Sequence, residues 1–255
     1  MPRPEPADHS EKRKETVRKQ KKSPAKFKYS AVLSDKEIRR ARRRGHIRIE
    51  PYNRAQVKPN SYDVRLGEFF FRQREDDSLL NMYAPGAQLW DRRRWRAIKL
   101  KEYVLKHHFA DISRDGIYDP ALHARYQQEH FKGISPKDRV FVLQPGETVL
   151  GHTEEFIGGV EGVTTMIKTR SSLGRNNIGI CKCAGWGDTG FTNRWTLEIT
   201  NFSTHRPVML VCGRRVGQIV FMSTGEVSAK YSGKYQSSAG WWPEDMLPRL
   251  ELDTD

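Results

Sequence analysis

The spacing of hydrophobic residues predicts one short helix early in the folded part of the chain. Ile38 and Ala41 lie three residues apart, and Ser34-Asp35-Lys36-Glu37 has the composition of a capping box, in which the first and last side chains bond to each other's backbone amides. Gly45 suits the position just after a helix end. The other face carries five arginines and is either a solvated surface or an anion contact: Arg39, Arg40, Arg42, Arg43 and Arg44.

Short apolar or alternating runs dominate the sequence after this helix. They are bounded by turn residues such as Pro145-Gly146, which is typical of β-strands. Several short strands broken by Gly, Pro and Asn predict a mainly β fold, a jelly roll or a β-barrel. The expected strands are Ser61–Leu66, Arg139–Leu143, Thr148–His152, Val163–Lys168, Arg194–Thr200, Pro207–Val211 and Val216–Ser223.

Residues 75–135 break this rhythm, and we interpret them as an insertion within a single domain that spans residues 29–248. The insertion holds Trp90, Trp95 and Arg92-Arg93-Arg94, and Pro120–Phe131 is expected to be helical. Arginine and tryptophan together can neutralise and stack on nucleic acid. An amphipathic cover with its tryptophans packed inward is the alternative, and the one we favour.

The two ends of the chain differ in charge from the domain between them. The first 30 residues hold ten Lys or Arg against four Asp or Glu, and apart from Met1 and Tyr29 their only large apolar residues are Val17 and Phe27. Such a segment cannot bury enough surface to offset the entropy of ordering it. We therefore expect residues 1–28 to form a disordered basic arm, which could bind nucleic acid or act as a nuclear or organellar address. Residues 249–255 form an acidic tail.

Composition narrows the class of protein further. The net charge of +14 over 255 residues favours a polyanionic partner, such as nucleic acid or nucleotide phosphates. Three cysteines cannot build a disulfide framework, and the Cys181-x-Cys183 pair has no second pair of metal-ligand spacing, so we expect neither disulfides nor a protein-held metal. With no membrane-length apolar run and no secretory signal peptide, a cytoplasmic protein is predicted.

Two neighbouring stretches carry candidate chemistry. Arg170-Ser171-Ser172-Leu173-Gly174-Arg175 places two cations and two hydroxyls at a strand-to-turn junction, a pattern suited to binding phosphate. The glycines of Cys183–Phe191 permit a tight hairpin, in which Trp186 or Phe191 could cover a base or a deoxyribose.

The strand that follows the hairpin alternates between two faces. Trp195, Leu197 and Ile199 are expected on one face, and Thr196, Glu198 and Thr200 on the other. A carboxylate flanked by threonines on a strand is either a surface position or a catalytic one.

In this order, these stretches resemble the dCTP deaminase/dUTPase superfamily, and most of all the dCTP deaminases that also hydrolyse dUTP. Their hairpin reads Ala-Gly-(Trp/Phe)-x-Asp-x-Gly-Phe, as residues 184–191 do here. The resemblance covers about 190 residues and implies a dUTPase-like distorted jelly roll or barrel, with the N-terminal helix and a partly helical insertion added. Further matching stretches are Leu33–Ile38, Asn60–Leu66, Leu143–Glu147, Arg215–Ile219 and Gly233–Gln236.

The resemblance implies zinc-independent deamination of dCTP to dUTP. Glu198 occupies the position of the general base and acid, and a water held between it and the Ala184 carbonyl would attack C4 of cytosine. Ser171 and Arg175 match residues that hold the reacting group and stabilise charge. Asp188 matches the residue beside the deoxyribose that helps to position water for release of pyrophosphate and formation of dUMP.

The remaining implied contacts bind the nucleotide. Arg170 and Ser172 match phosphate-loop positions, Thr196 and Leu197 offer their backbones to the base, and Trp186 lies at the hairpin. Mg²⁺ is implied only as a companion of the substrate triphosphate, and the implied assembly is a homotrimer with sites between subunits. Three C-terminal positions match triphosphate or neighbouring-subunit contacts: Gln218, Tyr231 and Lys234.

The sequence departs from the family pattern at two points near this site. Cys181 stands where deaminases have a histidine, and a thiol is a much poorer hydrogen-bond donor than an imidazole. Ser238 stands where a glutamine is usual. The alternatives to an enzyme are a catalytically silent member of the fold that binds nucleic acid or ribonucleoprotein through its basic additions, and a regulator that senses nucleotides without hydrolysing them.

Overall fold

The computed structural model describes residues 30–73, 95–99, 133–134, 138–233, 235–236 and 240–248. The expected basic arm, the acidic tail and most of the insertion, including the expected helix Pro120–Phe131, lie outside the described residues. Lys234 and Ser238 also lie outside them.

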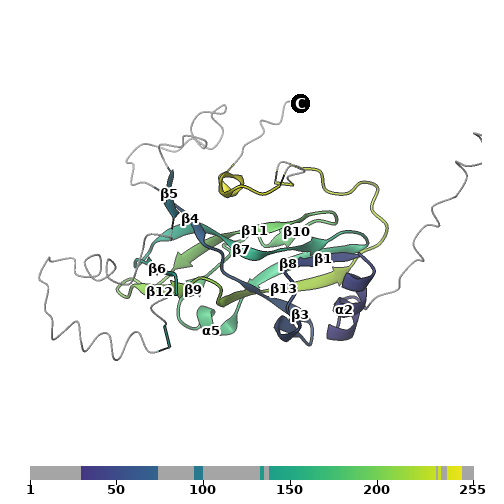
Figure 1. The fold of residues 1–255 in the computed structure, drawn as a ribbon, viewed down its shortest axis with the longest axis horizontal. Helices are drawn as coiled ribbons and strands as arrows, with labels where there is room; N and C mark the ends of the chain where they lie inside the picture. Colours follow the sequence, from purple (N-terminus) through teal and green to yellow (C-terminus); the bar gives the residue numbers. More distant parts are fainter. Residues whose placement is uncertain are drawn as a thin grey trace, which may run out of the picture.

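Two antiparallel sheets and a small two-stranded sheet form the described body (Figure 1). The larger sheet has the order β5-β4-β7-β11-β9, with β1 paired to β7, and its strands are β1 (Ile47–Glu50), β4 (Phe69–Gln73), β5 (Trp95–Lys99), β7 (Thr148–Gly159), β9 (Ile178–Gly179) and β11 (Thr192–Asn201). The second sheet has the order β10-β8-β13-β3-β2, with β2 (Val57–Lys58), β3 (Ser61–Arg65), β8 (Val163–Thr169), β10 (Trp186–Gly187) and β13 (Arg215–Ser223). The small sheet pairs β6 (Val140–Leu143) with β12 (Val208–Val211), and the helical elements are α2 (Asp35–Arg43), η1 (Arg54–Gln56), α5 (Ser171–Gly174) and η3 (Pro243–Met246).

The mainly β fold predicted from the sequence is confirmed, and the sheets stay open instead of closing into a barrel. The expected strands form, most of them within two residues of the predicted ends. The exception is β7, which continues seven residues past His152 to Gly159. Its extension carries Glu155, which is fully buried. The Glu155 carboxylate accepts hydrogen bonds from Gln56 Nε2 at 2.9 Å and Arg65 Nε at 2.7 Å. A buried carboxylate is tolerated on such a strand because these partners replace water.

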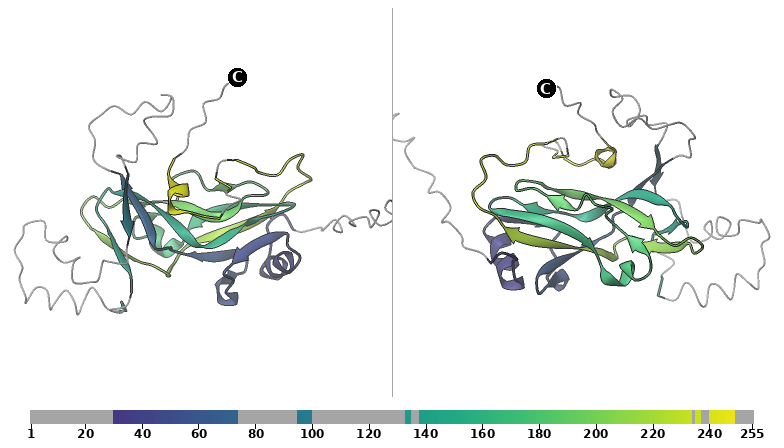
Figure 2. Two further views of the ribbon diagram at one scale, coloured as in Figure 1. Left: turned by 45° about the horizontal axis from the view of Figure 1, so that its top comes forward. Right: turned by 180° about the vertical axis from the view of Figure 1, so that it is seen from behind.

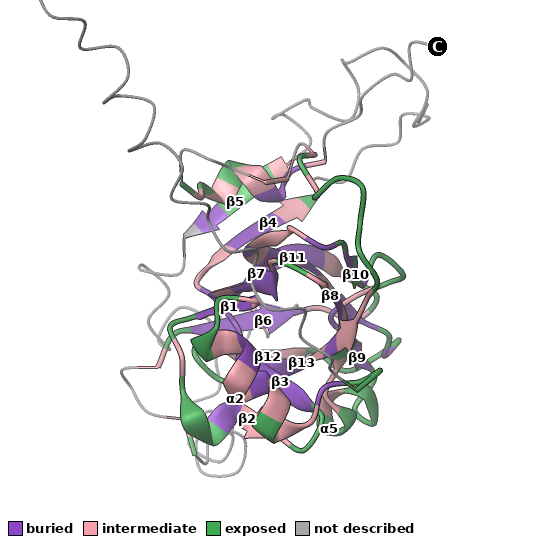
Figure 3. Ribbon diagram, turned by 90° about the vertical axis from the view of Figure 1, so that its right-hand side faces the viewer, coloured by how far each residue is buried: buried purple, intermediate pink, exposed green. Residues whose placement is uncertain are grey.

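The main core lies between the two sheets, where the buried strand residues gather (Figure 3). On β11, Trp195, Leu197 and Ile199 are 4%, 0% and 0% exposed, whereas Thr196 and Glu198 are half-buried on the other face. The predicted alternation of this strand is therefore confirmed. Thr200 alone departs from it: the residue is buried, and its Oγ1 lies 2.9 Å from that of Thr148 on β7.

The predicted capping box of α2 is present. Ser34 Oγ accepts from the Glu37 amide at 3.4 Å, and the Glu37 carboxylate accepts from the Ser34 amide at 2.9 Å. The hydrogen bonds that the Ser34 and Ser30 amides donate to its carboxylate lower the pKa of Glu37 to about 2. The arginine face of the helix is partly engaged with the protein, because Arg39 pairs with Asp35 and Arg42 lies 4.1 Å from the ring centre of Tyr52.

Replacing Ser34 with alanine should lower the free energy of unfolding by about 1 kcal/mol, because the Glu37 amide then loses its capping acceptor. Urea titration monitored by circular dichroism measures this loss. Ser228→Ala, in an exposed loop, is the matched control and should leave the midpoint unchanged. Equal midpoints for the two variants would show that the cap contributes nothing to stability.

A second apolar cluster lies on the outer face of the larger sheet. Phe71 on β4 and Leu150 on β7 pack there against Met246 and Leu247. These last two belong to residues 240–248, which we call the C-terminal strap and which crosses above β4, β7 and β11 (Figures 1 and 2). Trp95 is partly buried and also packs against the cluster, which is the arrangement that the amphipathic-cover alternative predicts for this residue. Trp90 lies outside the described residues.

Candidate nucleotide site

A cavity of about 350 Å³ opens between the hairpin after β9, the strand β11 and the C-terminal strap. Its walls are apolar and aromatic for the most part, with a few polar groups that converge on the same space, as small-molecule sites usually have. The lining residues that the sequence singled out are Ala184, Trp186, Asp188, Phe191, Thr196, Glu198 and Tyr231.

Glu198 points into this cavity from the middle of β11. The neighbouring residues Leu197 and Ile199 anchor the strand in the core, so the carboxylate has a rigid support. Its Oε2 atom accepts a hydrogen bond from the Lys182 amide at 2.9 Å, which ties the carboxylate to the start of the hairpin. Ala184, two residues further on, lines the same cavity. The structure therefore brings to one cavity the two residues, Glu198 and Ala184, between which the sequence analysis expected a water.

The hairpin is tight because its glycines leave no room for side chains. A Cβ atom on Gly187 would lie 2.5 Å from Thr165 Oγ1 and from the Trp195 ring, and Gly190 has a φ of +104°. The hairpin is fixed by β10, which pairs with β8, and by the Gly190 amide, which donates to the Gly159 carbonyl at 2.8 Å. This close approach holds the hairpin against the sheet, where it forms one wall of the cavity.

Aromatic side chains form the walls of the cavity. The Trp186 ring is 56% exposed, and its indole nitrogen donates to Asp188 Oδ1 at 3.1 Å. Phe191 packs edge-on against Trp195 and Tyr231, at centroid distances of 5.4 and 5.6 Å. Trp186 is thus the exposed ring at the cavity, whereas Phe191 is engaged by its neighbours. Leu197, by contrast, does not line the cavity, and its side chain is in the core.

Cys181 lies beside the carboxylate of Glu198. Burial above all, and then the negative charge of Glu198, raise the pKa of the Cys181 thiol. A Cβ atom on Gly185 would lie 3.1 Å from its sulfur atom. The side chain is therefore a protonated thiol packed under the hairpin, next to Glu198, the residue predicted from the sequence to be the general base.

The phosphate-loop residues do not join this cavity within one chain. Residues 170–175 form α5 and its caps on the side of the molecule opposite the C-terminal strap (Figure 1). Ser171, Ser172 and Arg175 are exposed there. Arg170 and Gln218 are half-buried and contact Asp63 instead. None of these five residues lines the cavity that contains Glu198.

A family model described as dCTP deaminase-like matches residues 32–110 and 102–224. The chain belongs to the dCTP deaminase-like family. Among curated relatives, it is 31% identical over 204 residues to the dUMP-forming dCTP deaminase of Methanoregula boonei, which covers 80% of this chain and 88% of the relative. It is 29% identical over 225 residues to that of Persephonella marina, covering 88% of this chain and 99% of the relative.

A solved structure of similar kind is the 2′-deoxycytidine 5′-triphosphate deaminase from Agrobacterium tumefaciens. It shares 20% identity with this chain at a TM-score of 0.48, covering 77% of this chain and 50% of that one. The family match spans the hairpin, β11 and the phosphate loop but ends before the C-terminal strap.

In this member of the dCTP deaminase-like family, the C-terminal strap contributes cavity residues that were not predicted from the sequence. Trp241, Asp245, Met246 and Pro248 line the same cavity as Glu198. The Arg194 guanidinium lies 4.7 Å from the ring centre of Trp241, and burial lowers the pKa of Arg194. The pair Trp241-Trp242 was the available signal, because two adjacent tryptophans near a polar chain end indicate an apolar contact.

Metal and membrane features are limited in the described part of the chain. No group of three or more His, Cys, Asp or Glu side chains there is arranged to hold a metal ion. All three cysteines are free thiols. Within the same residues, no helix is long and apolar enough to span a bilayer.

Proposed function

We propose that this protein deaminates dCTP, with Glu198 as the general base and acid. The observation that carries the proposal is the convergence of Glu198 and Ala184 on one cavity in a chain of the dCTP deaminase-like family. The dUMP-forming dCTP deaminases named above share about 30% identity with it over most of their length, which supports the same substrate.

In the proposed reaction, Glu198 takes a proton from a water held near the Ala184 carbonyl, and the resulting hydroxide attacks C4 of cytosine. Glu198 delivers this proton to N3 of the cytosine ring, which gives a tetrahedral C4 that carries a hydroxyl and the amino group. Glu198 then takes the hydroxyl proton and passes it to N4; as C4=O forms, the C4–N4 bond breaks and ammonia leaves, so that dCTP and water give dUTP and ammonia. The hydrogen bond from the Lys182 amide occupies Oε2, which leaves Oε1 to face the water. General acid–base catalysis of this kind needs the carboxylate at a fixed position rather than a metal.

We also propose that the protein releases pyrophosphate from the dUTP that it forms. A second water would attack the α-phosphorus, giving dUMP and pyrophosphate. Asp188 is the candidate for positioning that water, and its link to Trp186 holds it at the mouth of the cavity. The names of the relatives, which form dUMP, support this second step.

The complete site is proposed to need a second copy of the chain. Ser171 and Arg175, the candidates for charge stabilisation, lie on the opposite side of one chain from the C-terminal strap, so they would complete the site of a neighbour in a homotrimer (Figure 1). Mg²⁺ would be carried by the substrate triphosphate and would offset its charge. Mg²⁺ at nucleotide sites is usually bound by phosphate oxygens, waters and one or two carboxylates, so this role does not need a carboxylate cage from the protein.

The test is incubation of the full chain with dCTP and Mg²⁺, with separate assays for ammonia, dUMP and pyrophosphate. Equal amounts of all three support both steps, and ammonia with dUTP supports deamination alone. Release of neither ammonia nor pyrophosphate from dCTP or dUTP would refute the proposal. Salt-sensitive RNA or DNA binding in that case would favour the silent, nucleic-acid-binding alternative, whose arm and insertion lie mostly outside the described residues.

A further inference from the structure

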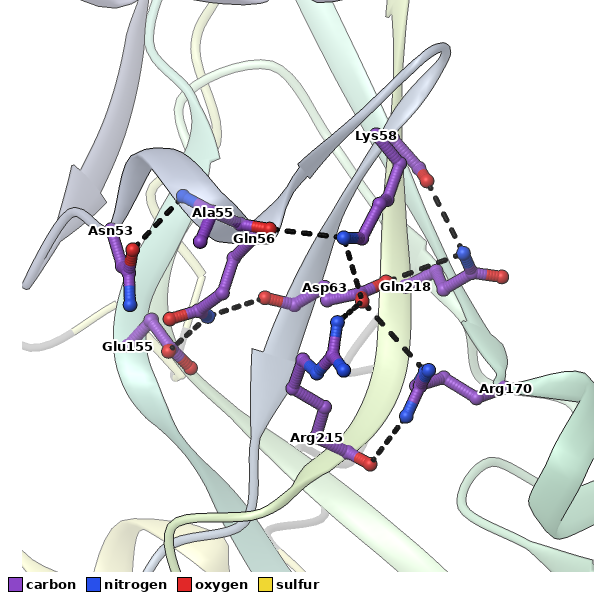
Figure 4. Close-up of polar contacts among 10 residues, drawn as sticks. Asn53, Ala55, Gln56, Lys58, Asp63, Glu155, Arg170, Arg215 and Gln218 are labelled. Carbon is purple, nitrogen blue, oxygen red and sulfur yellow. Dashed lines mark hydrogen bonds and ion pairs between the residues drawn. The ribbon is translucent and has the colours of Figure 1, made fainter.

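A buried carboxylate gathers three cations beside the phosphate loop. Asp63 on β3 is 1% exposed. Its Oδ2 atom lies 2.9 Å from Arg215 Nη1, 3.8 Å from Arg170 Nε and 3.9 Å from Lys58 Nζ. Figure 4 shows the three side chains reaching Asp63 from β2, β13 and the start of α5. We call Lys58, Arg170 and Arg215 the cation cluster.

The frame of this cluster is set by strand pairing. β3 and β2 pair with each other, and β13 pairs with both β3 and β8. Gln218 on β13 lies directly opposite Asp63 and donates to its Oδ1 atom at 3.3 Å. Arg170 is joined to β13 through the Arg215 carbonyl at 3.3 Å. The backbone ladder thus fixes Asp63, and Asp63 fixes the side chains.

The charges in the cluster do not balance. Three cations surround one carboxylate, and in the described part of the chain Asp63 is the only acidic partner that any of the three has. The side chains of Lys58, Arg170 and Arg215 remain 34%, 29% and 42% exposed. A fixed group with an excess of about two positive charges is suited to an anion of several charges, because planar guanidinium groups and an ammonium bind phosphate oxygens well.

We propose that the cation cluster binds the polyphosphate of the substrate and that Asp63 is its positioning residue. Lys58 and Arg215 are then phosphate-binding residues in addition to Arg170, and Asp63 contacts no substrate atom. The identity of the nucleotide rests on the proposed function, but the binding of a polyphosphate does not. Asp63 serves by holding three mutually repelling cations at one place, which a diffuse surface charge does not do.

Isothermal titration of the full chain with inorganic tripolyphosphate tests the cluster without any turnover. Lys58→Gln and Arg215→Gln should each weaken binding by about tenfold, the effect of losing one charge-assisted contact. Arg206→Gln, in the loop between β11 and β12, removes the same charge elsewhere and should leave the affinity unchanged. Unchanged affinity in both cluster variants, or an equal loss in the Arg206→Gln control, would overturn the proposal.

Asp63→Asn separates positioning from simple charge. The substitution makes the local charge more positive, so a diffuse electrostatic effect predicts tighter binding. Positioning predicts binding weaker by about tenfold, because the arginines lose their common partner. Tighter or equal binding by folded Asp63→Asn would overturn the role of Asp63. If this variant does not fold, Asp63→Glu decides instead: it keeps the negative charge but moves the carboxylate by one methylene, so weaker binding supports the role of Asp63 and unchanged binding overturns it.

Kinetics with dCTP then separates this proposal from the proposed function. Arg215→Gln should raise KM by about tenfold with kcat little changed, because the contact holds substrate and transition state alike. A wild-type chain that binds tripolyphosphate but releases no ammonia would leave the cation cluster standing and refute the deaminase. A chain that deaminates dCTP with the same KM in wild type and in Arg215→Gln would support the deaminase function and refute the role of the cation cluster.

Discussion

Replacing Glu198 with glutamine is expected to lower the rate of ammonia release from dCTP by about 10²–10⁴-fold. The amide has nearly the shape of the carboxylate but cannot accept a proton from water at neutral pH. Its oxygen can still accept from the Lys182 amide, so the hairpin keeps its anchor. The binding of dCTP and the melting temperature should therefore change little, which assigns the loss to the chemical step.

Single-turnover measurement of ammonia and calorimetric titration with dCTP check this result side by side. Glu161→Gln is the matched control, since Glu161 is exposed in the turn between β7 and β8 and does not line the cavity. Its turnover should equal that of the wild type. Turnover by Glu198→Gln at the wild-type rate would remove Glu198 from the mechanism and leave the cavity as a binding site only.

The folded state should lose about 3 kcal/mol of stability as the pH falls from 6.5 to 4, and His152 is the cause. The ring is 1% exposed, and burial lowers its pKa to about 4 from 6.5. Its Nδ1 atom lies 2.8 Å from the Thr153 carbonyl, and its Nε2 atom accepts from the Phe69 amide at 3.2 Å. A second ring proton would remove that acceptor, so the folded protein resists protonation.

The direction of the pH effect follows from proton binding. Between pH 6.5 and pH 4 the unfolded chain binds a proton at this histidine and the folded chain does not, so acid favours unfolding. A difference of about 2.5 pKa units corresponds to roughly 3 kcal/mol. Urea unfolding at pH 7, 5.5 and 4 measures it. His152→Gln should flatten the profile over this range, and the exposed His205→Gln should not. Equal slopes in the two variants would mean that another group controls acid stability.

Local features of the fold were predictable from the sequence because they depend on near neighbours. The capping box of α2 needs only Ser34 and Glu37, and the alternation of β11 needs only a period of two. The end of β7 was not predictable in this way. His152 and Glu155 look like the end of a strand, and they are buried only because Phe69, Gln56 and Arg65 from distant parts of the chain supply their hydrogen bonds.

The same distinction between local patterns and contacts from distant parts of the chain applies to the candidate site. Glu198, Ala184 and Asp188 come from one hairpin and its following strand, so their convergence was predictable from the motif. Arg170 and Gln218 were recognised as phosphate ligands, but their shared contact with Asp63 depends on the order of β3 and β13 in the sheet. The contribution of Trp241 was predictable only in part: the pair Trp241-Trp242 indicates an apolar contact, but no local pattern shows which surface the chain meets after Tyr235. The roles of Lys234 and the basic arm stay predictions.

The C-terminal strap would limit the rate at which nucleotides enter and leave the site, in addition to forming part of its wall. Met246 and Leu247 are 3% and 5% exposed, and both would return to water whenever the strap lifts from β4 and β7. Exposing two such side chains costs about 3–6 kcal/mol, so the lifted form would be a small fraction of the molecules at any moment. Nucleotide exchange would then require this rare opening, and product release would limit the turnover rate.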